Sequence, residues 1–347
     1  MTLLIGLVVA LLVAAVLLVV LLLALRVTSG LRTVRHTREH EATRGLVFEL
    51  VLGDPEDSAR ARRELAALQG GEWDRAEHQV FSLLPKVSGD TRERLVELVR
   101  QRNAADRARR LLRRRSSVAR CRGAHRLGAL RDPVDVAALT GCLHDRHFLV
   151  RRVALRALGS IGDPAAVPAI LATSDDPALT RDVVSALQRI GIDAAPDLRG
   201  CVEEGLRSAP GRATELAVIA LGLIGDAAAV PVLTRALDCV DEGVQAEAAI
   251  ALGLIGAPRA ISSLIARLDT DSDRVRRAAA RALGEIGDPK AADGLGSALS
   301  SSPRLTARAL AGALLRLGEA GRRVLQEHAS PYAREALAVD ALRKAAR

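Results

Sequence analysis

The sequence has few aromatic residues: one tryptophan, one tyrosine and three phenylalanines among 347 residues. β-Sandwiches and β-barrels depend on aromatic and β-branched side chains in alternating runs, so this scarcity argues against both. Lysine is nearly absent as well, and arginine supplies almost all of the positive charge behind the net charge of +9. Alanine, leucine and arginine dominate the chain, and all three favour helices. We therefore expect an all-α protein with an aliphatic core.

Cysteine and catalytic motifs are also scarce. The cysteines have neither the spacing of a zinc site nor that of a compact disulfide framework, and we expect all four to be reduced and buried: Cys121, Cys142, Cys201 and Cys239. A Gly-rich phosphate loop, a G-x-S-x-G elbow and an HExxH helix are missing. His144 and His147 lie three residues apart, but at an expected turn between repeats. We therefore expect no metal, no cofactor and no enzymatic activity.

Residues 3–25 form a run without charged side chains. At a rise of about 1.5 Å per residue, this run is long enough to cross a bilayer. We predict a transmembrane anchor over residues 1–26 and a basic juxtamembrane linker over residues 27–40. Arginines follow the run and none precedes it, which predicts a single-pass protein of the cell membrane with its C-terminal domain in the cytoplasm. A cleaved signal peptide is the alternative, although a basic leader and a clear cleavage site are missing.

A short phrase of the form Leu-Gly-x-Ile-Gly-Asp-Pro recurs along the rest of the chain, in four clear and three degenerate copies. Successive copies begin 31, 29, 34, 31, 31 and 31 residues apart. Self-similarity at such a period is typical of solenoids built from helical hairpins. The leading leucines of the copies are Leu127, Leu158, Leu187, Leu221, Leu252, Leu283 and Leu314.

Each repeat is predicted to form two helices, and the end of the phrase separates them. The segment from Val275 to Leu283 places its apolar residues on one helical face. Gly287 can then take the left-handed conformation that ends a helix, Asp288 can cap the next helix, and Pro289 suits a first helical position. A single hairpin cannot bury its apolar surface alone, so consecutive hairpins are expected to stack.

The phrase V-R-x-x-A-x-x-A-L-G-x-I-G-D-P resembles the HEAT repeat family, and its short period is most similar to the phycobilisome-lyase (PBS lyase) subgroup. The resemblance covers roughly residues 116–345. It implies a right-handed α-solenoid of stacked helical hairpins, here about seven repeats plus a C-terminal cap over residues 116–347. Residues 41–115 are helical by pattern but lack the phrase. We interpret them as degenerate N-terminal repeats, with an independent small helical domain as the alternative.

Some members of this subgroup are enzymes. Those similar to deoxyhypusine hydroxylase hold two irons with His-Glu pairs at the start of the phrase-bearing helix, but the matching positions here read Arg151-Arg152 and Arg276-Arg277. A bilin-lyase role would need a pigment-attachment context that the sequence lacks. Nucleic-acid binding is not expected either, because single-strand readers stack bases on aromatic rings and only Phe148 and Tyr332 lie within the repeats.

The resemblance also implies that the phrase-bearing helices line the concave face of the solenoid. One stripe of these helices is aliphatic in two adjacent repeats, at Ile219, Leu223, Ile250 and Leu254. Neighbouring repeats have polar residues there, and we expect a rim formed by Arg152, Arg156, Arg277 and Arg281. The alternative is that tighter local curvature buries the aliphatic residues. Other arginines either extend the rim or pair with acids of neighbouring repeats: Arg120, Arg151, Arg276 and Arg308.

These observations favour a membrane-anchored cytoplasmic scaffold or adaptor that binds another protein through the concave face of the solenoid. The patch suits a partner helix or an acidic, amphipathic segment. A noncatalytic accessory subunit of a membrane-bound, envelope-assembling enzyme is the first alternative, and a lyase or hydroxylase of the short-repeat type is the second. Residues 100–131 hold twelve arginines and one acid. This segment is either a contact for anionic lipid or a solvated helix face.

Overall fold

The computed structural model describes residues 43–328 and 330–345, and within them the regular secondary structure is entirely helical. The chain forms two compact units that divide between Arg107 and Ala108. The predicted transmembrane anchor and the basic linker lie outside the described residues. Among the residues that are described, no helix combines the length and the apolar character needed to span a membrane.

The first unit is a small group of helices without the repeated phrase. Residues 43–52 are helical, and α2 (Pro55–Ala67), α3 (Gly70–Leu83), η1 (Leu84–Lys86) and α4 (Gly89–Gln101) follow. Trp73 of α3 is buried, and the guanidinium of Arg102 lies 4.4 Å from the centre of its ring. Buried Glu77 pairs with Arg107. Whether these helices are degenerate repeats stays a prediction. The next helix, α5 (Ala104–Leu112), contains the division between the units.

The second unit is a row of helical hairpins, each made of a long phrase-bearing helix and a second helix. The long helices are α6 (Ser117–Leu130), α8 (Phe148–Ile161), α10 (Thr180–Ile190), α12 (Arg212–Ile224), α14 (Glu242–Ile255), α16 (Asp273–Ile286) and α18 (Arg304–Arg316). The second helices are α7 (Val136–Gly141), α9 (Val167–Leu171), α11 (Ala195–Arg207), α13 (Val230–Ala236), α15 (Ile261–Ala266), α17 (Ala292–Leu299) and α19 (Glu319–Glu327), and α20 (Pro331–Ala345) closes the row. The predicted all-helical solenoid is confirmed.

Short 3₁₀ turns connect the helices. One set follows the phrase: η2 (Pro133–Asp135), η4 (Pro164–Ala166), η6 (Gly191–Ala194), η7 (Ala227–Ala229), η8 (Pro258–Ala260) and η10 (Pro289–Ala291). The other set precedes a long helix: η3 (Cys142–His144), η5 (Pro177–Leu179) and η9 (Arg267–Asp269). Each turn lets the chain reverse direction within a few residues, which keeps the two helices of a hairpin in contact.

The phrase ends one helix and starts a turn. Gly287 follows α16 with a φ of 73°, the left-handed region that favours glycine. The carboxylate of Asp288 then accepts a hydrogen bond of 2.9 Å from the backbone N–H of Lys290. That bond caps η10, not α17, so the predicted cap lies one turn earlier than expected, because the proline after it begins a 3₁₀ turn. In the first repeat Arg131 takes the place of this glycine, with a φ of 59°.

The first glycine of the phrase allows successive long helices to approach closely. A Cβ built on Gly222 would lie 2.7 Å from the Cα of Ala251, and one built on Gly253 would lie 2.7 Å from the Cα of Ala282. Side-chain carbons do not approach this closely, so these contacts require glycine. The same pairing recurs at Gly128 with Ala157, Gly159 with Ala186, and Gly284 with Ala313. Between α10 and α12 the corresponding position is the exposed Gln188.

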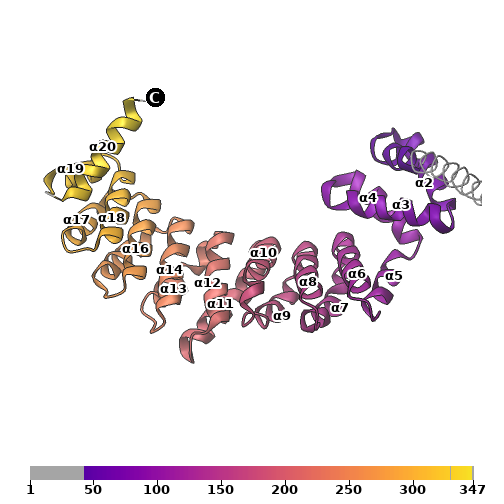
Figure 1. Ribbon diagram of the computed structural model, residues 1–347, viewed down its shortest axis with the longest axis horizontal. Helices are drawn as coiled ribbons and strands as arrows, with labels where there is room; N and C mark the ends of the chain where they lie inside the picture. Colours follow the sequence, from indigo (N-terminus) through magenta and orange to yellow (C-terminus); the bar gives the residue numbers. More distant parts are fainter. Residues whose placement is uncertain (1–42, 329, 346–347) are drawn as a thin grey trace, which may run out of the picture. The chain divides into compact units, whose positions relative to one another are not determined.

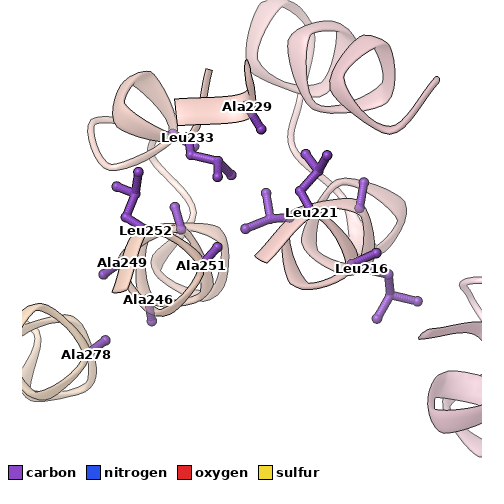
Figure 2. Packing of buried hydrophobic residues seen from close by; sticks show 14 of the residues in the cluster. Leu216, Leu221, Ala229, Leu233, Ala246, Ala249, Ala251, Leu252 and Ala278 are labelled. Atoms are coloured by element: carbon purple, nitrogen blue, oxygen red, sulfur yellow. The ribbon is translucent and has the colours of Figure 1, made fainter. Parts of the chain in front are cut away.

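Leucines and alanines fill the space between the two layers of helices. Figure 2 shows Leu221, Leu233 and Leu252 at the centre of the packing around α12, α13 and α14. Ala249 and Ala278 lie where α14 and α16 face each other. All five residues are buried. Small side chains between long helices and larger ones between layers therefore maintain the row.

We predict that Gly222→Ala destabilises the protein, because the new methyl group overlaps the backbone of α14. The expected loss is about 1–3 kcal/mol of unfolding free energy. Gly200 lies in α11, and a methyl group added there would meet nothing within 4 Å. Gly200→Ala is therefore the matched control, and we expect it to stabilise by about 0.4–1 kcal/mol. Urea denaturation followed by helical circular dichroism measures both, and equal effects of the two changes would contradict the close-approach account.

Candidate functional site

The candidate site lies on the inner side of the second unit. Figure 1 shows its hairpins in a curved row, with the long helices from α6 to α18 along the inner side and the second helices along the outer side. The inner surface is therefore formed by residues of successive long helices about thirty positions apart in the chain. Its chemistry changes from repeat to repeat, because each helix contributes its own exposed stripe.

Ile219, Leu223, Ile250 and Leu254, here called the aliphatic patch, lie in the second halves of α12 and α14. Leu223 is 41% exposed and Leu254 is 52% exposed. Ile219 and Ile250 are half-buried and pack against the core. Burial by local curvature therefore applies in part to the isoleucines and not to the leucines. The patch is therefore an exposed pair of leucines, each one turn after a half-buried isoleucine on the same helix.

A polar cluster occupies the first halves of the same helices. The Nη2 atom of Arg274 lies 3.2 Å from the carboxylate of Glu247 and 3.6 Å from that of Glu215. Arg212 pairs with Glu215 and donates a 3.1 Å hydrogen bond to the hydroxyl of Thr180. These contacts join α10, α12, α14 and α16. No short sequence motif marks this cluster, because its partners come from four helices.

Some arginines of the predicted rim already form ion pairs within the protein. Arg152 and Arg156 of α8 each contact one carboxylate oxygen of Asp182 on α10, at 3.0 and 3.1 Å. Asp182 is buried, and the guanidinium of Arg152 also lies 5.5 Å from the centre of the Phe148 ring. Arg156 nevertheless keeps 60% of its side chain exposed. On the same face Arg189 donates a 3.1 Å hydrogen bond to the hydroxyl of Ser160.

The arginines on the other side of the rim make longer and more exposed contacts. Arg281 lies 3.9 Å from Glu285 on the same helix, and Arg316 of α18 lies 3.7 Å from the same carboxylate. Arg281 and Arg316 keep 65% and 51% of their side chains exposed. Arg277 is half-exposed and its charge helps to lower the pKa of Asp273, after hydrogen bonds from Thr306 and Arg276. The structure therefore places all eight predicted residues on long helices, with the two arginine groups on opposite sides of the patch.

Three further arginines pair with acids of neighbouring repeats, as the alternative for them predicted. Arg120 holds Asp145 through two hydrogen bonds, of 2.6 and 2.9 Å, and Arg151 reaches Asp176 at 2.8 Å. Arg308 pairs with Glu335 of α20, whereas Arg276 pairs with Asp273 of its own helix. The hydrogen bonds from Arg120 hold the pKa of Asp145 below its usual value, although partial burial acts in the opposite direction. These arginines connect turns and helices and do not extend the rim.

The basic segment 100–131 is also divided between structural and exposed arginines. Arg102 donates to two backbone carbonyls, and Arg109 pairs with buried Asp135 at 2.5 Å. Exposed arginines lie together where α5 leads into α6: Arg110, Arg113, Arg114 and Arg115. Contact of this segment with anionic lipid stays a prediction.

The described cysteines and histidines lie on several different elements of the chain. Among the residues that the structure describes, no group of three or more His, Cys, Asp or Glu side chains could hold a metal ion. Of the four cysteines, only Cys142 is buried, so the expectation of burial was wrong for the other three, which are half-exposed. Burial raises the pKa of the Cys142 thiol. His144 and His147 are both exposed.

A shallow hollow of about 360 Å³ lies on the outer layer, between α11 and α13. Its lining combines charged and apolar groups: Glu203, Leu206, Arg207, Arg235, Asp238 and Cys239. Arg235 and Glu203 lie 3.7 Å apart across it. The hollow is lined by residues on or just after the second helices, whereas the aliphatic patch lies on the long helices.

Family comparisons identify the repeats. Residues 202–281, 241–316 and 264–346 match the model of HEAT repeats, and residues 150–176 match that of the PBS lyase HEAT-like repeat. The predicted HEAT repeats are therefore confirmed over these residues, and they include both helices of the aliphatic patch. None of the curated proteins matches the chain.

One of the similar solved structures shows the same kind of fold. The karyopherin Kap121p bound to the SUMO protease Ulp1p is similar with a TM-score of 0.55 and 14% identity, over 82% of this chain and 38% of the karyopherin. The CpcE–CpcF complex of phycocyanin lyase from Nostoc sp. PCC7120 has a TM-score of 0.34 and 25% identity, over 64% of this chain and 92% of that one. Human deoxyhypusine hydroxylase has a TM-score of 0.32 and 20% identity, over 82% and 99%. The first similarity shows a shared helical solenoid, and the other two carry no argument about activity.

We predict that the two halves of the aliphatic patch respond differently to charge. Leu223→Asp combined with Leu254→Asp should change the unfolding free energy by less than about 1 kcal/mol, because both side chains are exposed. Ile219→Asp combined with Ile250→Asp should cost about 1–3 kcal/mol per substitution, because each carboxylate replaces a group packed on the core. Urea denaturation of the full chain measures both pairs. Equal losses would mean that the leucines also belong to the core.

The pair of Arg120 and Asp145 predicts a pH dependence of stability. Because the pKa of Asp145 is lowered in the folded state, its contribution is complete above its unfolded pKa, about 3.9, and is lost as pH falls through the folded pKa. Arg120→Gln should therefore lower stability at pH 7, and the difference from the unaltered protein should shrink below about pH 4. Denaturation across pH measures this difference. Arg281→Gln, which removes an exposed contact, is the control and should show little effect at any pH.

Proposed function

We propose that this protein is a membrane-anchored cytoplasmic scaffold or adaptor that binds another protein through the inner face of its HEAT solenoid. The observation that supports the proposal is the aliphatic patch, in which Leu223 and Leu254 remain about half exposed on adjacent helices. Equivalent positions of the flanking repeats are charged, at Arg189 and Glu285. Exposed aliphatic side chains in one place, with charged groups around them, are typical of protein-binding surfaces.

The patch has the layout expected for the centre of an interface. Burying a leucine side chain completely stabilises a fold or a complex by about 1.5–3 kcal/mol. Leu223 and Leu254 are only partly buried, so a partner that covers them would gain part of this free energy on binding. Each leucine lies one turn after a half-buried isoleucine on the same helix, so the patch is part of a rigid helical surface, which lowers the entropic cost of binding. A stable complex needs a larger contact area than the patch alone. The curved row of long helices on each side supplies it (Figure 1).

The charged groups around the patch favour binding over chemistry on a small substrate. Glu215 and Glu247 already pair with Arg212 and Arg274, so these side chains order the surface. The arginines further out are partly exposed and suit encounter and orientation of a partner. The anchor in this proposal is the apolar run of residues 3–25, and the arginines that follow it place the solenoid in the cytoplasm.

Site-specific photocrosslinking in intact cells tests the proposal. A photoreactive amino acid is placed at Leu223 or at Leu254 of the full chain, and we expect each to give the same protein adduct. Val240, which is 94% exposed beyond α13, is the matched control position and should not give that adduct. Removal of residues 1–26 should release the chain from the membrane fraction and weaken the adduct. Adducts equal at all three positions, or none at the leucines, would contradict the proposal.

A further inference from the structure

Charge varies systematically along the inner face of the solenoid, and this order carries information about the partner. Three regions follow one another in the row of long helices: a first flank on α8 and α10, the aliphatic patch on α12 and α14, and a second flank on α16 and α18. The inference rests on the proposed function and concerns the chemistry of the bound segment.

The first flank is positive. Its arginines are Arg152, Arg156, Arg181 and Arg189, and its single acid is Asp182, which leaves a formal charge of +3. Arg156, Arg181 and Arg189 are exposed, although Arg156 contacts Asp182. One buried carboxylate cannot neutralise four guanidinium groups, so the surface that a partner meets here is cationic.

The second flank is positive as well. The exposed stripe of α16 and α18 carries Arg277, Arg281, Arg308 and Arg316 against Glu285 and the Glu335 that pairs with Arg308, a formal charge of +2. The contacts of Glu285 with Arg281 and Arg316 are long, at 3.9 and 3.7 Å, and all three side chains are exposed to a large extent. Pairs of this kind contribute little free energy in water, so the arginines can turn toward a partner at small cost.

The centre has no excess of positive charge. Glu215 and Glu247 are matched by Arg212 and Arg274, exposed Glu242 begins α14, and the aliphatic patch occupies the second halves of both helices. A polyanion with evenly spaced phosphates would lie over two carboxylates and two leucines in this region, without aromatic rings to stack on. A peptide segment with an aliphatic centre matches the inner face, whose regions are positive, apolar and positive in that order.

We propose that the inner face binds an extended peptide segment of a partner protein with aliphatic anchors at its centre and acidic residues on both sides. Neighbouring long helices lie about 8–10 Å apart, and an extended chain advances about 3.3 Å per residue. An extended segment that crosses the row therefore passes from one long helix to the next about every three residues. The two anchors contact Leu223 and Leu254, and the acidic residues follow about three to six positions away on each side, opposite the two flanks.

Labelled synthetic peptides test this order directly. The reference probe carries two leucines three residues apart, with a block of glutamates on each side. Companion probes carry lysine blocks, serine in place of leucine, or glutamates on one side only. Binding to the full chain in detergent is measured by fluorescence anisotropy at several salt concentrations. We expect the reference probe to bind at least about tenfold more tightly than the lysine probe, with a preference that falls as salt rises.

Charge-reversed variants show whether both flanks take part. The first-flank variant combines Arg181→Glu with Arg189→Glu, and the second-flank variant combines Arg277→Glu with Arg281→Glu. Each should weaken the reference probe about tenfold, and each should affect a different one-sided probe, which also reports the direction of the segment. The control combines Arg259→Glu with Lys290→Glu in the turns η8 and η10, where both residues are exposed. It should bind the reference probe as the unaltered chain does.

The inference is overturned if glutamate and lysine probes bind equally, if no probe binds, or if the control weakens binding as much as the flank variants. Loss of affinity with serine in place of leucine supports the central contact, and equal affinity overturns it. The proposed function is judged separately, because photocrosslinks at Leu223 and Leu254 do not require an acidic partner. If these crosslinks form but glutamate and lysine probes bind equally, the adaptor function stands and the acidic segment is rejected.

Discussion

The close approach of successive long helices is the constraint on which the second unit depends. At Gly222 and Gly253 the backbone of one helix contacts an alanine of the next, with no room for a side chain between them. This contact sets the distance between repeats, and the exposed stripe of each long helix is therefore held beside that of its neighbour. Without this spacing, Leu223 and Leu254 would not form a single patch.

Ion pairs provide a second level of order between repeats. Arg120 with Asp145, Arg151 with Asp176, and the two arginines on Asp182 all connect one repeat to the next. Several of these pairs are partly buried, where leaving either member unpaired would be costly. They fix the relative orientation of neighbouring hairpins that small alanines alone would leave adjustable. The polar cluster around Glu215 and Arg274 does the same beside the aliphatic patch.

The third repeat departs from the regular pattern of the row. It has Gln188 where α6, α8, α12, α14 and α16 have the packing glycine, and its second helix, α11, is as long as α12. The longer helix accounts for the 34-residue spacing between Leu187 and Leu221. The change falls between the first flank and the aliphatic patch. The two regions of the proposed binding face therefore meet at the repeat interface that is built differently from the rest.

The repeated phrase was enough to predict the helical hairpins and the residues of the aliphatic stripe, because it places its caps, glycines and leucines at a nearly constant period. It could not reveal which arginines are already paired, since their partners lie about 25 to 30 positions away and follow no motif. It also left open whether the four aliphatic residues are core or surface. That the isoleucines pack on the core while the leucines stay exposed became visible in the folded chain alone, because burial depends on how closely the neighbouring helices pack.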